Sequence, residues 1–183
     1  MNGNECDAIM IDLKNETVIN VATLLQEPVG ARRSYPLALD VFPLDRDLTA
    51  EEIEGGVKLT TLIDEIVAAI DARGVVTLEC QRCLTPYRQP FETGFDEEFR
   101  VTVDVKSGAG IATKDDDERF TIDENHELDF AEPLRQEILV ALPMRPTCGA
   151  DCPGPPALEF GADDGVDDRF AALAKLLDDE PGA

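Results

Sequence analysis

The chain has 183 residues, of which 39 are acidic and 16 basic, so its formal net charge is −23. A negative field of this size repels phosphate and excludes tight, non-specific nucleic-acid binding over the whole surface. Hydrophobic residues make up 43%, enough for one domain with a core, and no apolar run approaches the roughly 20 residues that cross a bilayer. The five cysteines and the absence of a leader pattern predict a cytoplasmic protein with reduced or metal-bound thiols.

The first half of the chain predicts one short helix followed by several strands. VATLLQE, residues 21–27, places its apolar residues on one helical face behind Asn20, a plausible cap. The later apolar patterns alternate, and we expect strands at about 34–44, 57–63, 66–80 and 87–103. Residues 62–72 also fit a helical stripe, so helix and strand both stay open there.

The second half begins with a Gly-rich and then acidic stretch, residues 106–128, which predicts a disordered loop. Asp129 can cap a helix that carries Pro133 in its first turn and ends before Pro143. A short C-terminal helix is expected to start at Asp167 or Asp168 and to carry apolar residues as far as Leu177.

Together these patterns predict an α+β fold. We expect an antiparallel sheet of four or more strands with a few short helices packed against it, an acidic disordered loop and a C-terminal helix. The expected organisation is an N-terminal extension at 1–19, a domain at 20–156 and an acidic tail at 157–183.

The charge is distributed unevenly along the chain. Residues 94–129 hold 12 acids and 4 bases, a net charge of −8, whereas residues 73–91 hold one acid and three arginines, a net of +2. Residues 133–156 are balanced, with two acids and two arginines. The two segments that carry cysteine pairs are therefore the least acidic parts of the chain.

The pairs Cys80-x-x-Cys83 and Cys148-x-x-x-Cys152 are candidate ligands for a metal ion. Two thiolate pairs suit tetrahedral zinc, although 64 residues between the pairs is far more than a zinc ribbon has. Unmetallated thiols are the alternative. A thioredoxin-like couple is a third reading, but LTPYRQP after Cys83 is a poor start for the helix that such a couple needs.

Catalytic groups are scarce. The single histidine, His126, lies in the acidic stretch DENHELD, where we expect it to be solvated. Ser34 and Ser107 lack the GxSxG context of a hydrolase nucleophile, and the carboxylates form runs without a recognisable acid–base pair. The sequence therefore predicts a protein that is not an enzyme.

Two blocks, VTLECQRCLTPYRQPFETGFDEEF and DFAEPLRQEILVALPMRPTCGADC, together resemble the YceD family of large ribosomal RNA subunit accumulation proteins. The resemblance spans about residues 20–177, and the sequence departs from fuller family members after Cys152, where PGPPALEF follows. It implies a role in synthesis, processing or stability of 23S ribosomal RNA, without an established catalytic activity. It also implies that Cys80, Arg82, Cys83 and Leu84 form the family signature, with Cys148 and Cys152 in the second block.

Charge and resemblance together lead to the functional expectation. An RNA-contacting surface should use the arginines of the less acidic segments, above all Arg82, Arg88 and Arg145, unless these close salt bridges. We therefore expect a non-enzymatic factor for 23S ribosomal RNA in large-subunit assembly. The first alternative is an acidic protein-interaction module, stabilised by zinc at the cysteines, that binds a basic ribosomal protein or assembly factor. The second alternative is a thiol oxidoreductase.

Overall fold

The structure is a computed structural model that describes residues 16–105, 107–111 and 120–155. The elements, in chain order, are β1 (Val18–Asn20), α2 (Ala22–Leu25), β2 (Arg32–Asp45), β3 (Leu48–Thr61), β4 (Glu65–Glu79), β5 (Pro86–Val101), β6 (Phe120–Ile122), β7 (Glu127–Asp129) and α3 (Ala131–Ala141). The expected C-terminal helix at 167–177 and Cys6 lie outside these residues, and the domain boundaries stay a prediction.

Within the described residues the main sheet has five strands in the order β2-β3-β4-β5-β6, and β1 and β7 pair separately. The four long strands form consecutive antiparallel pairs, as expected. The expectation of a purely antiparallel sheet is wrong at one edge, where β6 runs parallel to β5. The connection between them, residues 102–119, is long enough for the crossover that parallel strands require.

The structure makes residues 65–79 one continuous strand, which settles the choice between helix and strand. Ile66, Ala68 and Ile70 are fully buried and alternate with more exposed neighbours, the period-two pattern of a strand with one face in a core. Both edges of β4 are paired, by β3 and by β5. A helix over these residues would leave the edges of β3 and β5 that face β4 unpaired.

Strand β3 begins at Leu48, well before the expected position near residue 57, because it contains an irregularity that hides the alternation. Its register with β4 shifts between Glu51 and Glu54, and Glu52 adopts a positive φ of 55°. Gly74 lies opposite, where an added Cβ would be 2.9 Å from the carbonyl oxygen of Glu51. The bulge therefore needs a glycine on the neighbouring strand and increases the local twist.

The expected disordered loop at 106–128 is wrong over its last nine residues. Phe120 and Ile122 lie in β6 and Leu128 lies in β7, and both Ile122 and Leu128 are fully buried. Three apolar side chains thus anchor a segment whose charge predicts disorder. Residues 112–119, which hold most of the acidic run, lie outside the described residues.

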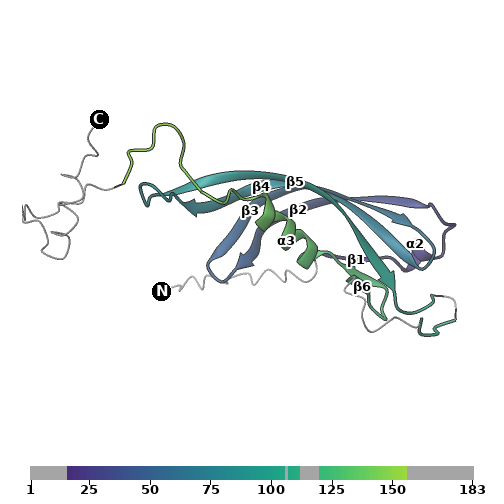
Figure 1. Cartoon of the computed structure of the whole chain (residues 1–183). Coiled ribbons are helices and arrows are strands. Elements are labelled where there is room, and N and C mark those ends of the chain that lie inside the picture. The colour runs from purple at the N-terminus through teal and green to yellow at the C-terminus, as the bar shows by residue number, and fades with distance from the viewer. Residues whose placement is uncertain (1–15, 106, 112–119, 156–183) are drawn as a thin grey trace, which may run out of the picture.

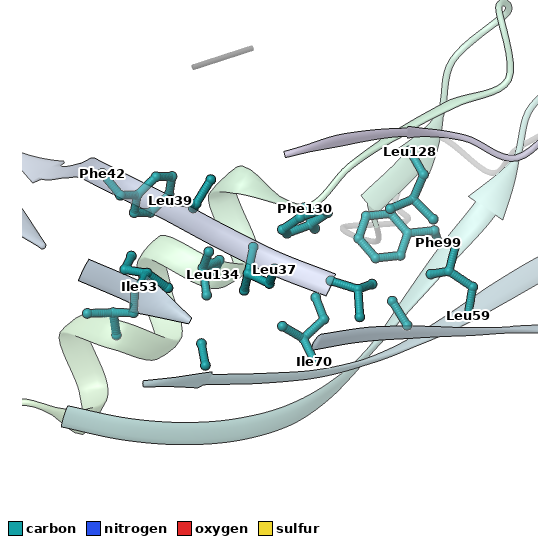
Figure 2. Packing of buried hydrophobic residues seen from close by; sticks show 14 of the residues in the cluster. Leu37, Leu39, Phe42, Ile53, Leu59, Ile70, Phe99, Leu128, Phe130 and Leu134 are labelled. Atoms are coloured by element: carbon teal, nitrogen blue, oxygen red, sulfur yellow. The ribbon is translucent and has the colours of Figure 1, made fainter. Parts of the chain in front are cut away.

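Helix α3 covers one face of the arched sheet, with β1 and β6 beside it (Figure 1). Leu134 and Ile138 of α3 are fully buried against the strands, and Figure 2 shows Leu134 and Phe130 directed toward Leu37, Leu39 and Ile70. The N-cap residue is Phe130, one residue after the expected Asp129, although the carboxylate of Asp129 accepts a hydrogen bond from the amide of Ala131 at 2.9 Å. Leu142 is extended, because Pro143 follows it.

A candidate four-cysteine metal centre

The first cysteine pair lies in the turn that joins β4 to β5. Cys80 follows the last residue of β4, and its amide donates to the carbonyl of Thr85 at 3.0 Å. The amide of Leu84 returns to the carbonyl of Cys80 at 2.9 Å, with Leu84 at a positive φ of 59°. This tight turn brings Cys83 back beside Cys80, as a metal-binding knuckle requires.

The second pair lies on the segment that leaves α3 and reaches the same turn. The amide of Gln81 donates to the carbonyl of Pro146 at 2.9 Å, and the amide of Cys148 donates to Sγ of Cys80 at 3.4 Å. Gly149, at a φ of 116°, then turns the chain toward Cys152. We call residues 80–86 together with 145–152 the four-cysteine tip.

The sulfur atoms of Cys80, Cys83, Cys148 and Cys152 all lie within 4.8 Å of one another. The Sγ atoms of Cys80 and Cys152 are 3.8 Å apart, and those of Cys83 and Cys148 are 3.7 Å apart. Zn–S bonds of about 2.3 Å in a tetrahedron place neighbouring sulfurs about 3.8 Å apart. The observed distances therefore fit a tetrahedral zinc ion and are far too long for disulfide bonds.

The surroundings of Cys80, Cys83 and Cys148 shift the pKa values of these thiols in different directions. The backbone amide of Cys83, with smaller contributions from the amides of Arg82 and Cys148, lowers the pKa of the Cys80 thiol to about 6. The pKa of Cys83 is also lowered, chiefly by the Thr85 side chain. The pKa of Cys148 is raised to about 12, first by its hydrogen bond with the Cys152 side chain and then by burial, with charge repulsion from Cys152 as the smallest contribution. A bound cation would remove that repulsion.

The structure brings together all four cysteines that the sequence named as ligands. It places Cys80 and Cys83 between two strands, where neither thiol has the helix N-terminus on which a thioredoxin-like couple depends. Sequence reasoning missed two residues of the site. The side chain of Thr85 interacts with Cys83 and lowers its pKa, and the carbonyl of Pro146 accepts the hydrogen bond that joins the segment after α3 to the turn between β4 and β5. A threonine directly after C-x-x-C-L is the signal that could have indicated the first.

The arginines named as RNA contacts fall into two groups. Arg88 pairs with Glu52 at 3.0 Å and approaches Glu51 at 3.8 Å. Arg82 and Arg145 make no ion pair with any residue in the described ranges, and both are exposed on the four-cysteine tip. The other arginines of the less acidic segments, Arg73 and Arg135, pair with Glu54 and Glu132.

His126 is not fully solvated as expected. Its side chain is half-buried in the turn between β6 and β7, and its Nδ1 atom is buried without a hydrogen-bond partner among the described residues. The backbone carbonyl of His126 accepts from the amide of Val21 at 2.9 Å, which ties this turn to the start of α2. The residue therefore helps to hold the turn in place.

Comparison with known families matches residues 68–177 to the model described as Large ribosomal RNA subunit accumulation protein YceD. The match covers more than half of the chain and contains all four cysteines of the tip. This chain belongs to the YceD family. The resemblance inferred from the two cysteine blocks is thereby confirmed.

Curated relatives include uncharacterized proteins of Mycobacterium tuberculosis and Mycobacterium bovis. Each is 30% identical to this chain over 145 residues, a stretch that covers 75% of this chain and 63% of the relative. The chain thus spans somewhat less than two thirds of these relatives' length. No solved structure matches. In the parts of the chain that the structure describes, no helix has the length and apolar character to span a membrane.

Proposed function

We propose that this protein is a non-enzymatic factor that supports the synthesis, processing or stability of 23S ribosomal RNA during assembly of the large subunit in the cytoplasm. Membership of the YceD family is the observation that carries the proposal. The family's description names accumulation of large-subunit ribosomal RNA, and the matched region includes the four-cysteine tip.

The tip is proposed to hold a structural zinc ion. Its four sulfurs have the spacing of a tetrahedral site, and two of them come from the segment after α3. The hydrogen bonds from Gln81 to Pro146 and from Cys148 to Sγ of Cys80 join this segment to the turn between β4 and β5. A zinc ion bound by both pairs would fix residues 143–152 against the turn between β4 and β5. Its role here is to shape a surface.

That surface is proposed to contact RNA directly through Arg82 and Arg145. The hydrogen bond from Gln81 to Pro146 joins the neighbours of these two arginines, so the tip presents both from one joined backbone. Arginines already paired with carboxylates have less to gain from phosphate, which favours these two over Arg88. A local contact of this kind is compatible with the strongly negative remainder of the chain.

Crosslinking in cells followed by RNA sequencing tests this proposal. The full chain should crosslink to 23S ribosomal RNA or its precursor, and Arg82→Ala combined with Arg145→Ala should lower the yield. The control combines Arg32→Ala with Lys58→Ala, which removes the same charge at two positions that also lack ion pairs with described residues.

The two double variants discriminate between the outcomes. Equal loss of crosslinking in both would contradict a contact localised at the tip. If the unaltered protein yields protein crosslinks but no ribosomal RNA, the alternative of an acidic module that binds a basic ribosomal protein replaces the proposal.

A further inference from the structure

The main sheet has two faces, and the described helices and short strands cover only one of them. Figure 1 shows α3 and β1 beneath the arch of β2 to β5, while no described helix or additional strand lies over the opposite side. On that outer face the side chains of β3, β4 and β5 are mostly polar or small. We call it the outer face.

A groove crosses the middle of the outer face. Its lining includes Glu54, Asp71, Arg73, Glu92 and Gly94, together with backbone of neighbouring residues. Asp71 on β4 is opposite Gly56 on β3 and Gly94 on β5, so neither cross-strand neighbour supplies a side chain. The groove exists because, of the three neighbouring residues Gly56, Asp71 and Gly94, only Asp71 has a side chain.

Strands β3 and β4 approach each other closely beside this row. Gly56 and Gly94 lie opposite Asp71 on the outer face, whereas Gly55 lies opposite Ala72 and alternates to the inner face. An added Cβ at Gly55 would lie 1.9 Å from the carbonyl oxygen of Asp71, and one at Gly94 would lie 3.3 Å from a carboxylate oxygen of Asp71. Gly55 therefore cannot take a side chain unless β3 and β4 separate. The carboxylate of Asp71 leans over the open position of Gly94.

The charges of the groove are unbalanced. Three carboxylates, those of Glu54, Asp71 and Glu92, accompany one guanidinium, that of Arg73. Arg73 is paired with Glu54 at 3.0 Å, whereas Asp71 and Glu92 have no ion-pair partner among the residues that the structure describes. The groove therefore holds two carboxylates that a cationic partner can reach.

We propose that this groove binds an extended polypeptide segment of a partner protein that carries arginine or lysine at alternate positions. In the register of β4 and β5, Glu92 lies opposite Arg73 and Gly94 lies opposite Asp71, so Asp71 and Glu92 are diagonal neighbours on adjacent strands. Such neighbours lie about 7–8 Å apart. Alternate side chains of an extended chain are about 7 Å apart, so two of them can meet both carboxylates.

Other occupants fit this groove less well. Nucleic acid brings phosphates toward unpaired carboxylates, which repel them. A single calcium or magnesium ion needs oxygens about 2.0–2.6 Å away, and carboxylates on diagonal positions are too far apart to share one readily. An extended basic segment satisfies both the charge and the spacing.

The inference goes beyond the proposed function, because it adds a second contact on a face that carries neither the cysteines nor Arg82 and Arg145. It rests on the geometry of the groove alone. If the proposed function holds, the matching partner is a basic protein of the assembling subunit. The binding experiment below is performed with purified protein, so its failure leaves the RNA crosslinking result unaffected.

The test titrates the full chain into a fluorescein-labelled peptide of alternating glycine and arginine. Asp71→Asn combined with Glu92→Gln should weaken binding by about tenfold or more, because it removes both unpaired carboxylates. The control, Asp47→Asn with Glu124→Gln, removes the same charge from two exposed turns and should change the affinity by less than about twofold. Thermal melting of both variants verifies that they are folded.

Equal weakening in the two double variants would overturn the proposal, because it would show that the peptide responds only to the overall field. Nuclear magnetic resonance of the full chain gives a second reading. The peptide should shift the amides of β3, β4 and β5 around Asp71, and shifts spread over all acidic surfaces would contradict the assignment. Displacement of the peptide from the groove by oligoadenylate RNA would also overturn it, since RNA would then be the better occupant.

Discussion

The backbone amide of Gln81 donates a hydrogen bond to the carbonyl of Pro146 at 2.9 Å, and this bond joins two segments that are far apart in the sequence. One segment is the turn between β4 and β5, and the other follows α3. Each carries a cysteine pair close to the bond and, directly beside the bonded residue, an arginine that has no ion-pair partner among the residues described by the structure. The candidate metal ligands and the candidate RNA contacts are thus brought together by the same backbone contact.

The first prediction concerns metal content. Purified protein should carry about one zinc ion per chain, and Cys83→Ser should lose it and lower the melting temperature, because the site fixes the segment after α3 only when all four thiolates are present. Elemental analysis and thermal melting measure both effects. Cys6→Ser provides a matched control, since Cys6 lies outside both cysteine pairs of the sequence. Zinc-free protein whose stability is unaffected by Cys83→Ser would refute the metal centre.

The second prediction concerns the close approach of β3 and β4. Gly55→Ala should destabilise the protein by about 1–3 kcal/mol, because the new methyl group would have to displace the carbonyl of Asp71, 1.9 Å from its position. Gly56→Ala should cost less, since its nearest atom would be 3.7 Å away. Urea unfolding of both variants measures the difference. Equal costs would mean that the strands separate easily at this row.

The third prediction concerns acid stability. The side chains of Arg135 and Gln136 lower the pKa of Glu132 from 4.5 to about 2, the arginine contributing most. A depressed carboxyl pKa stabilises the folded state above pH 4.5, and this contribution is lost as the pH falls from about 4.5 toward 2. The pair is partly exposed, so the effect should not exceed about 1 kcal/mol. Glu132→Gln should lower the melting temperature at neutral pH and converge with the unaltered protein near pH 2.

The matched control for that series is Glu124→Gln, which removes an exposed carboxylate from a turn. Its melting temperature should follow that of the unaltered protein over the whole pH range. If Glu132→Gln behaves in the same way, the contact with Arg135 contributes nothing measurable to stability.

The long strands could be predicted from the sequence because alternation within each strand reports one buried face. The pattern in β4 and β5 is of this kind. The end of α3 before Pro143 could also be predicted, whereas its N-cap is Phe130, one residue after the expected Asp129. The start of β3 could not be predicted, since the bulge at Glu52 breaks the alternation. Nor could the parallel pairing of β6, because a three-residue strand carries too little pattern to show its direction.

The candidate site was predictable in its ligands and not in its contacts. The spacing of the cysteines predicted all four candidate ligands. The convergence of the two pairs could not be predicted, because it depends on where α3 ends and on how the next segment reaches the turn between β4 and β5. The ion pairs of Arg88 with Glu51 and Glu52 were likewise invisible, because they depend on the register of the sheet. The groove around Asp71 arises from glycines on two different strands and has no signature in either strand alone.

The ratio of 23S to 16S ribosomal RNA in cells tests the central claim most directly. It should be compared among cells that lack this protein and cells whose only copy is unaltered, Cys83→Ser, Arg82→Ala with Arg145→Ala, or Cys6→Ser. The account predicts a low ratio without the protein, with Cys83→Ser and with the arginine variant, and a normal ratio with the unaltered chain and Cys6→Ser. A normal ratio in cells that lack the protein would contradict a role in accumulation of 23S ribosomal RNA.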